Sequence, residues 1–161
     1  MRDLEFTIHI KYFESGEALP ESYQSLINKA KEAAQNAYAP YSQFKVGAAL
    51  LLADGSIVTG NNQENIAYPS GLCAERVAFF HASAVKPGVE ILAVAVEILS
   101  GDVVVSGASP CGGCRQVMAE YETKQSKPIT VIMPAENGGH YIADSIDDLL
   151  PFQFKAEGLK K

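Results

Sequence analysis

The three cysteines of this chain lie in two short segments that are far apart in the sequence. Cys73 is followed by Ala-Glu in the first segment, and the second segment, residues 110–114, reads P-C-G-G-C. Cys111 and Cys114 are three residues apart, so they share one face of a helix and are able to chelate a single ion. A fold that lets all three thiolates hold one ion therefore has to bring the starts of two distant segments together.

Three thiolates leave the fourth position of a tetrahedral zinc ion open, which is typical of catalytic rather than structural sites. An odd number of cysteines that includes a C-x-x-C pair suits a reducing compartment and a metal site better than a disulfide framework. A structural site with a histidine as fourth ligand is the alternative. His81 is excluded because it lies about 12 Å along the same predicted helix from Cys73, whereas His9 and His140 stay open.

The composition of the 161 residues, 47% of them hydrophobic, fits one ordinary domain, and we expect residues 1–161 to form it. The N-terminus lacks the apolar run of a signal peptide, and no segment reaches the roughly 18 apolar residues of a membrane span. We therefore expect a cytoplasmic protein with no membrane partner. The net charge of −6 argues against a nucleic-acid partner, because phosphate backbones are bound chiefly by Lys and Arg.

Hydrophobic periodicity and turn residues predict alternating helices and strands. The expected helices are 20–38, 72–85 and 111–121, with a helical turn at 146–150. The expected strands are 46–53, 56–60, 91–99, 129–133 and 140–142; residues 103–105 either extend the third strand or form a short one beside it. Residues 5–13 read as a strand or an extended arm. This order predicts an α/β fold with three layers, α/β/α, around a mixed five-stranded sheet.

Both cysteine segments fall where a loop enters a predicted helix, so free N–H groups and the helix dipole would favour the thiolate form. Three thiolates around a divalent cation leave a net charge of −1, which makes a bound water harder to ionise. We expect Arg76 to compensate by donating hydrogen bonds to the cysteine sulfurs. An ordinary ion pair on the helix surface is the alternative role for this residue.

The C-A-E and P-C-x-x-C segments resemble the signature of zinc-dependent nucleoside and nucleobase deaminases, in the variant with cysteine as first ligand. Further matching segments follow in the same order, at residues 39–44, 46–49, 60–65, 68–76, 109–117 and 149–151. Over about residues 38–150 the chain resembles the small, homotetrameric class of cytidine deaminases. Residues 1–20 lie outside the resemblance and form an N-terminal extension of unknown role.

The resemblance implies hydrolytic deamination of cytidine and 2′-deoxycytidine to the corresponding uridines with release of ammonia, a step of pyrimidine salvage. It implies one zinc ion per subunit, held by the three cysteines and acting on a water molecule, with Glu75 as general base and acid. The implied substrate-binding residues are Asn62 and Glu64 on the ribose, Phe44 on the pyrimidine face, and the Ala74 backbone on the amide edge of the base. Taken alone, Asn62 and Glu64 also read as polar loop residues, and Phe44 as core.

Tyr68 and Phe154 resemble residues that complete the pocket of a neighbouring subunit, although Phe152 is an alternative to Phe154. Three rivals remain. A deoxycytidylate deaminase is disfavoured because the matched segments show no cationic group for a 5′-phosphate and no histidine as first ligand. A blasticidin-type deaminase is disfavoured because the Asn62-x-Glu64 pair suits a ribose. The third rival is a binding module that the same cysteines stabilise through a structural zinc ion.

Overall fold

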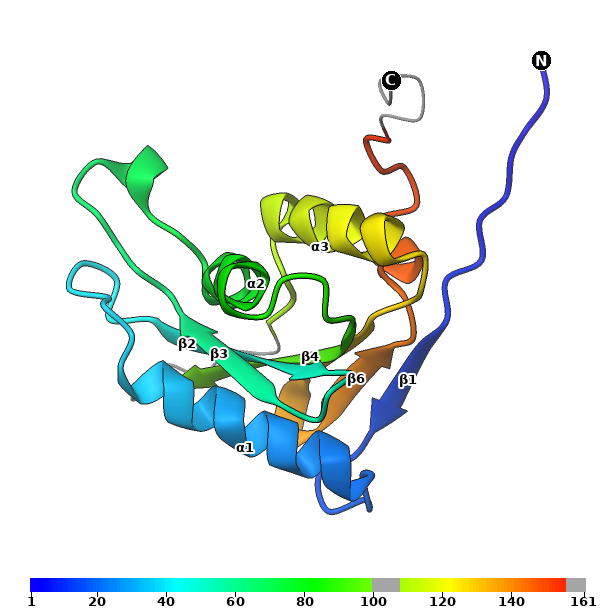
Figure 1. Cartoon of the computed structure of the whole chain (residues 1–161). Helices are drawn as coiled ribbons and strands as arrows, with labels where there is room; N and C mark the ends of the chain where they lie inside the picture. Colours follow the sequence, from blue (N-terminus) through cyan, green and yellow to red (C-terminus); the bar gives the residue numbers. More distant parts are fainter. Residues whose placement is uncertain (100–107, 156–161) are drawn as a thin grey trace.

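A mixed six-stranded sheet forms the middle layer of the protein, in the strand order β1-β6-β5-β4-β2-β3. The structure is a computed structural model that describes residues 1–99 and 108–155. Its strands are β1 (Ile10–Phe13), β2 (Lys45–Leu52), β3 (Ile57–Asn61), β4 (Ile91–Leu99), β5 (Thr130–Pro134) and β6 (His140–Ala143). Helix α1 (Glu21–Gln35) covers one face, and α2 (Ala74–Val85) and α3 (Gly112–Gln125) cover the other (Figure 1). The predicted three-layer α/β fold is confirmed.

The predicted number of five strands is wrong, because the segment before α1 adds a sixth. Strand β1 pairs antiparallel with β6, with Tyr12 opposite Tyr141. Two further contacts tie the segment down: the Lys11 ammonium lies 2.6 Å from the Asp144 carboxylate, and the His9 backbone N–H donates to Asp148 at 3.1 Å. Residues 103–105, predicted either to extend the strand at 91–99 or to form a short strand beside it, lie outside the described residues.

The central part of the sheet follows the predicted hairpin. Strands β2 and β3 pair antiparallel around Asp54-Gly55, and β2 also pairs antiparallel with β4. Strand β4 then pairs parallel with β5, and α3 connects the two. This is the one parallel pair among the described strands, and it makes the sheet mixed. Parallel strands need a crossover connection, which α3 provides, whereas antiparallel strands can be joined by a hairpin.

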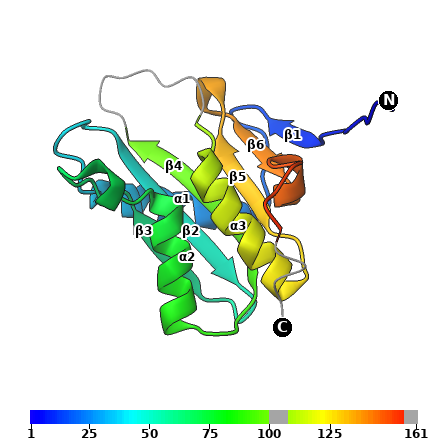
Figure 2. The ribbon, with the colours of Figure 1, turned by 90° about the horizontal axis from the view of Figure 1, so that it is seen from above.

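Apolar side chains on both sheet faces form the two cores. Beneath α1 the sheet contributes Ala49, Ala93, Ala95, Ile132 and Ile142, which pack on Leu26, Ile27 and Ala30. The opposite core, under α2 and α3, is built around Phe79, Met118 and Ile146. Helices α2 and α3 lie side by side across this face (Figure 2). Because both helices begin at the same end of the sheet, their N-termini come together.

Gly60 on β3 allows α2 to approach the sheet closely. A Cβ atom at this position would lie 2.4 Å from the Ala78 nitrogen and 2.7 Å from the Ala74 oxygen, which no side chain tolerates. Glycine is therefore required here for packing. The close approach of Gly60 to Ala74 and Ala78 positions the start of α2, next to Cys73 and Glu75.

Three short 3₁₀ turns complete the described elements: Tyr68–Ser70, Glu136–Gly138 and Ile146–Asp148. The last of these corresponds to the helical turn predicted at 146–150. Among the described helices, we find none with the length and apolar content that a membrane span requires.

Candidate metal centre and active site

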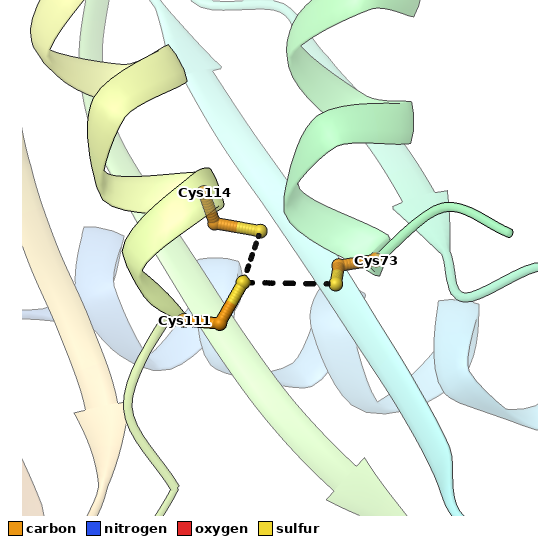
Figure 3. A group of neighbouring side chains, drawn as sticks. All are labelled: Cys73, Cys111 and Cys114. Carbon is orange, nitrogen blue, oxygen red and sulfur yellow. Dashed lines mark hydrogen bonds between the residues drawn. The ribbon is translucent and has the colours of Figure 1, made fainter. Parts of the chain in front are cut away.

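Cys73, Cys111 and Cys114 meet at the paired starts of α2 and α3. Cys73 is the N-cap of α2 and Cys111 is the N-cap of α3, while Cys114 lies in the first turn of α3 and is fully buried. The Cys111 sulfur lies 4.0 Å from that of Cys73 and 3.6 Å from that of Cys114 (Figure 3). All three sulfurs lie within 4.8 Å of one another.

These distances fit a zinc ion. A tetrahedral ion with Zn–S bonds of about 2.3 Å holds its sulfurs about 3.8 Å apart. Within residues 1–99 and 108–155, no ligand atom of a histidine, aspartate or glutamate joins the three sulfurs. His140, one of the two histidines that the sequence left open, instead bonds through Nε2 to Glu97 at 2.7 Å. The described donor set therefore leaves a fourth position open.

The protonation of the thiols also favours a cation. Hydrogen bonds from the Cys114 thiol and from Arg76 lower the pKa of Cys73 to about 5. The hydrogen bond to Cys73 and burial raise the pKa of Cys114. Without a cation, ionisation of the Cys73 thiol therefore keeps the Cys114 thiol protonated. A divalent cation stabilises both thiolates, because metal binding displaces the protons of its ligands.

Arg76 lies where the sequence predicted it, beside the sulfur cluster. Its Nη2 is 3.9 Å from the Cys73 sulfur and 3.4 Å from the Gly71 carbonyl oxygen. Its Nε is buried and has no hydrogen-bond partner among the described residues. A guanidinium at this point adds positive charge next to a thiolate ligand, which lowers the net negative charge of the site.

Glu75 lies in the first turn of α2 and is only 5% exposed. Burial is the main cause that raises the pKa of its carboxyl above the ordinary glutamate value. The Cys73 thiolate adds to this rise in pKa and the Cys114 thiol opposes it, as expected for a carboxyl near the sulfur cluster. A buried carboxyl next to an open metal position is suited to accept and return protons.

The loops on either side of the cysteines are held by hydrogen bonds. Gln63 and Leu72 exchange two backbone bonds of 2.9 Å, which fix the approach to Cys73. Arg115 donates from Nε to the Pro110 carbonyl at 2.8 Å and from Nη1 to the Leu149 carbonyl at 2.8 Å. The next residue, Gln116, exchanges two hydrogen bonds with the Phe154 backbone. No sequence pattern indicates these anchoring roles of Arg115 and Gln116.

A cavity of about 560 Å³ opens beside Cys73. The predicted site residues that line it are Asn62, Glu64, Tyr68, Cys73 and Arg76. It is also lined by Tyr41, Ser42, Gln63 and Asn65, for which the sequence predicts no individual role. These four residues lie within or next to the matched motif segments, so their position in the motifs was the available signal.

Asn62 and Glu64 shape the cavity through the loop that precedes β2. The Asn62 side chain accepts from the Val46 N–H at 2.8 Å and donates to the Phe44 carbonyl at 2.9 Å. Glu64 accepts from the Tyr41 N–H at 2.9 Å and from the Ser42 N–H and hydroxyl. The Ser42 hydroxyl is the main cause that lowers the pKa of Glu64.

Three predicted substrate residues lie outside the lining of this cavity. Phe44 is half-buried, and Ala74 is fully buried at the first residue of α2. Phe154 is 75% exposed and Phe152 is 76% exposed, so neither ring packs into the core of its own chain.

Comparison with known proteins agrees with this geometry. Residues 20–128 match the family model described as the cytidine and deoxycytidylate deaminase zinc-binding region. A cytidine deaminase of Halalkalibacterium halodurans is 40% identical over 136 residues, which span 84% of this chain and 96% of the relative. A cytidine deaminase of Mycobacterium tuberculosis is 37% identical over 141 residues, 86% of this chain and 94% of the relative.

Solved structures give the same result. The crystal structure of cytidine deaminase from Burkholderia pseudomallei superposes with a TM-score of 0.71 at 42% identity, covering 82% of this chain and 98% of that one. The one from Mycobacterium tuberculosis gives a TM-score of 0.66 at 34% identity, covering 84% and 99% of the two chains. Sulfur geometry, family match and structural similarity thus lead to one conclusion: the chain belongs to the zinc-binding cytidine and deoxycytidylate deaminase family.

Proposed function

We propose that this protein deaminates cytidine and 2′-deoxycytidine by hydrolysis, giving uridine and 2′-deoxyuridine with release of ammonia. The observation that carries the proposal is the set of three sulfurs with an open fourth position, next to the buried Glu75 and to a cavity large enough for a nucleoside. The similar proteins named above are cytidine deaminases, which supports this substrate.

The chemistry divides between the metal and the protein. When bound, a zinc ion supplies Lewis acidity to a water molecule at its open position. Cys73, Cys111 and Cys114 would hold the ion, and Arg76 would withdraw negative charge from the Cys73 sulfur. Glu75 accepts a proton from the attacking water while the water oxygen bonds to ring carbon C4.

Glu75 then returns the protons to the substrate. It delivers the first proton to ring nitrogen N3 and the second to the amino group, whose bond to C4 breaks as ammonia leaves. One water molecule is consumed and both of its hydrogens pass through the same carboxyl. A group that alternates between base and acid works best when its pKa lies above that of an ordinary carboxyl, which is the direction that burial gives Glu75.

Asn62 and Glu64 are proposed to bind the ribose. In the described structure each already bonds to the loop before β2, but each keeps free capacity, because an amide or carboxylate oxygen accepts more than one hydrogen bond. A sugar hydroxyl can therefore be added without breaking the loop contacts. Phe44 is proposed to pack on the pyrimidine, and the backbone at Ala74 to read the amide edge of the base.

We further propose a cytoplasmic homotetramer that serves pyrimidine salvage, built from one domain of residues 1–161. Phe154 is exposed and its backbone is fixed to α3 by Gln116, which suits a ring that reaches the cavity of a neighbouring subunit. Tyr68 is 80% exposed on the rim of the cavity and is proposed to contribute in the same way.

Among the rivals, a 5′-monophosphate substrate is disfavoured by the cavity. Arg76 is the one cationic side chain in the described lining, and it faces the Cys73 sulfur, while Glu64 adds a negative charge. We expect turnover of cytidine, followed by ultraviolet absorbance, to exceed that of cytidine monophosphate and of blasticidin S. Preference for either of the other two substrates would refute the nucleoside assignment.

The main test is Glu75→Gln, measured as cytidine turnover together with zinc content. We expect zinc to be retained and turnover to fall by about 10³-fold or more, since the proton carrier is lost. Glu97→Gln is the matched control, because Glu97 is also 5% exposed but lies away from the sulfurs, against His140. Near-normal turnover in Glu75→Gln would refute the role of Glu75.

Metal removal separates the enzyme from a zinc-stabilised binding module. We expect a chelator to abolish turnover while most of the far-ultraviolet circular dichroism remains, because Cys114 is the one sulfur ligand among the many buried members of the two cores. Unfolding in step with zinc loss would instead indicate a structural ion.

A further inference from the structure

The segment before α1 carries an apolar pattern that the deaminase site does not use. We refer to residues 2–13 as the N-terminal arm. Every second residue from Leu4 to Tyr12 is apolar and exposed: Leu4 (66%), Phe6 (52%), Ile8 (53%), Ile10 (39%) and Tyr12 (47%). The residues between them are mostly polar or charged. The match to the family model begins only at residue 20, so the arm lies outside it.

Only the last part of the arm is paired. Residues Ile10–Phe13 form β1 at the edge of the sheet, and among the described strands none pairs with the outer side of β1. The preceding residues run away from the sheet as an extended trace (Figure 1). Along this stretch the His9 backbone N–H bonds to Asp148, and the rings of Phe6 and Phe152 lie with their centroids 4.8 Å apart. An unpaired strand edge with exposed apolar side chains is a template for pairing with another chain.

The apolar residues of the arm share one face. Ile10 lies opposite Ala143, which belongs to the core under α3, and Tyr12 lies against the Tyr141 ring at 5.3 Å. Side chains alternate between the two faces of a strand. If the strand continues toward the N-terminus, Leu4, Phe6 and Ile8 therefore extend this apolar face, and the polar residues lie on the other.

Two copies of the arm are complementary when they run antiparallel with Thr7 of one copy opposite Thr7 of the other. In that antiparallel register Asp3 faces Lys11 and Glu5 faces His9, so each carboxylate meets a basic side chain. On the other face Leu4 meets Ile10 and Phe6 meets Ile8, which are aromatic and aliphatic cross-strand pairs that stabilise sheets. No two like charges lie opposite each other in this register.

We propose that the arm pairs antiparallel with the arm of a second copy of this chain, with Thr7 of both copies at a two-fold axis. The pairing would be isologous, since the same segment serves as both partners. It joins the two six-stranded sheets through their β1 edges and covers the free edge of each. The proposal is independent of the catalytic assignment, because no arm residue lines the cavity or the sulfur cluster.

Cysteine cross-linking of the zinc-loaded protein of residues 1–161 tests the register. We expect Thr7→Cys to form a covalent dimer on mild oxidation, seen on a non-reducing gel, because the two new thiols face each other. Glu5→Cys is the matched control: it lies on the same face of the same arm, but its two copies would be about 13 Å apart, beyond disulfide reach. A mixture of Glu5→Cys and His9→Cys should cross-link, because these two positions lie opposite each other in the proposed register.

The unsubstituted protein shows how much cross-linking arises from the metal-site cysteines alone. Equal cross-linking of Thr7→Cys and Glu5→Cys, or none with either, would overturn the proposed register.

Charge reversal tests the pairing independently of other subunit interfaces. Asp3→Lys with Glu5→Lys places like charges opposite each other, and we expect this change to abolish the covalent dimer that Thr7→Cys forms. His9→Glu with Lys11→Glu in Thr7→Cys should do the same, and mixing the two variants should restore the cross-link. Cytidine turnover of each variant reports that the domain is folded. An unchanged cross-link in both variants, or none in the mixture, would show that the arm serves a different partner.

Discussion

The metal centre and the rim of the cavity are neighbours, yet they are built in opposite ways. The three cysteines lie at helix starts, with Cys114 fully buried, Cys73 partly buried and Cys111 exposed, and the neighbouring Glu75 is 5% exposed. The rim consists of loops, and its Tyr41 and Tyr68 side chains are 52% and 80% exposed. The first region depends on helix packing, and the second on hydrogen bonds from side chains to loop backbone.

This difference separates the two tasks of the site. In the proposed mechanism the reacting groups have to keep their distances, and the structure attaches them to packed elements whose position is set by core contacts. The rim has to admit and release a ligand, so it is joined by individual hydrogen bonds that are exposed to water. Changes in the metal centre should therefore abolish turnover, whereas changes in the rim should alter substrate affinity.

The largest expected effect is that of Cys114→Ala. Loss of one of three ligands should remove most of the zinc and lower cytidine turnover by more than about 10³-fold. Zinc quantification distinguishes this variant from Glu75→Gln, which should lose turnover with its metal in place. Full zinc content with active enzyme would show that Cys114 is not a ligand.

The next effect tests whether packing holds the metal centre in position. Gly60→Ala inserts a Cβ atom 2.4 Å from the Ala78 nitrogen, so α2 has to shift, at an expected cost of about 1–3 kcal/mol in the free energy of unfolding. Chemical denaturation measures this cost. Gly112→Ala is the control, because nothing lies within 4 Å of its Cβ position and alanine favours a helix. Equal losses in both variants would contradict the close contact between β3 and α2.

A smaller effect is expected in the rim. The Ser42 hydroxyl bonds to Glu64 and accepts from the Phe44 N–H at 3.0 Å. Ser42→Ala removes both contacts, and we expect KM for cytidine to rise about three- to tenfold, as for one or two lost hydrogen bonds, with little change in kcat. Steady-state kinetics measures both parameters. A fall in kcat with unchanged KM would show that the rim takes part in the chemical step.

The smallest effect concerns the titration of Glu64. Its folded-state pKa is lowered, chiefly by the Ser42 hydroxyl, so the contribution of the ionised carboxylate to stability is present above the ordinary glutamate pKa. That contribution is lost as the pH falls through the lowered value. NMR titration of the Glu64 carboxyl should show its pKa rising in Ser42→Ala. An unchanged pKa in that variant would mean that the backbone N–H groups alone hold the carboxylate.

The same contrast governs what the sequence was able to predict. The helices and the β2–β3 hairpin follow from apolar periodicity and from Asp54-Gly55, and the cysteine spacing indicated that α2 and α3 begin together. Strand β1 was left undecided, because its pairing with β6 depends on contacts between distant residues such as Lys11 and Asp144.

The rim was predicted only in part, for the same physical reason. The motif indicated Asn62 and Glu64 as ligand-binding residues, but not that both hold the loop before β2. Such bonds join a side chain to the backbone of a segment about twenty residues away, and local patterns do not specify them. The part of Arg115 in fixing Pro110 and Leu149 was missed on the same grounds.

The adjacency of Arg115 and Gln116 on α3 has a practical consequence for anyone who attaches this protein to a support. The Phe154 backbone is held by Gln116, and the loop that carries Cys111 is held by the preceding side chain, Arg115. Tension applied beyond residue 155 is therefore transmitted to Gln116, which is adjacent to Arg115, the residue that holds the loop of Cys111. A tether on the exposed side of α1, for example at Lys29, acts across the sheet from the sulfurs and leaves that anchor unloaded.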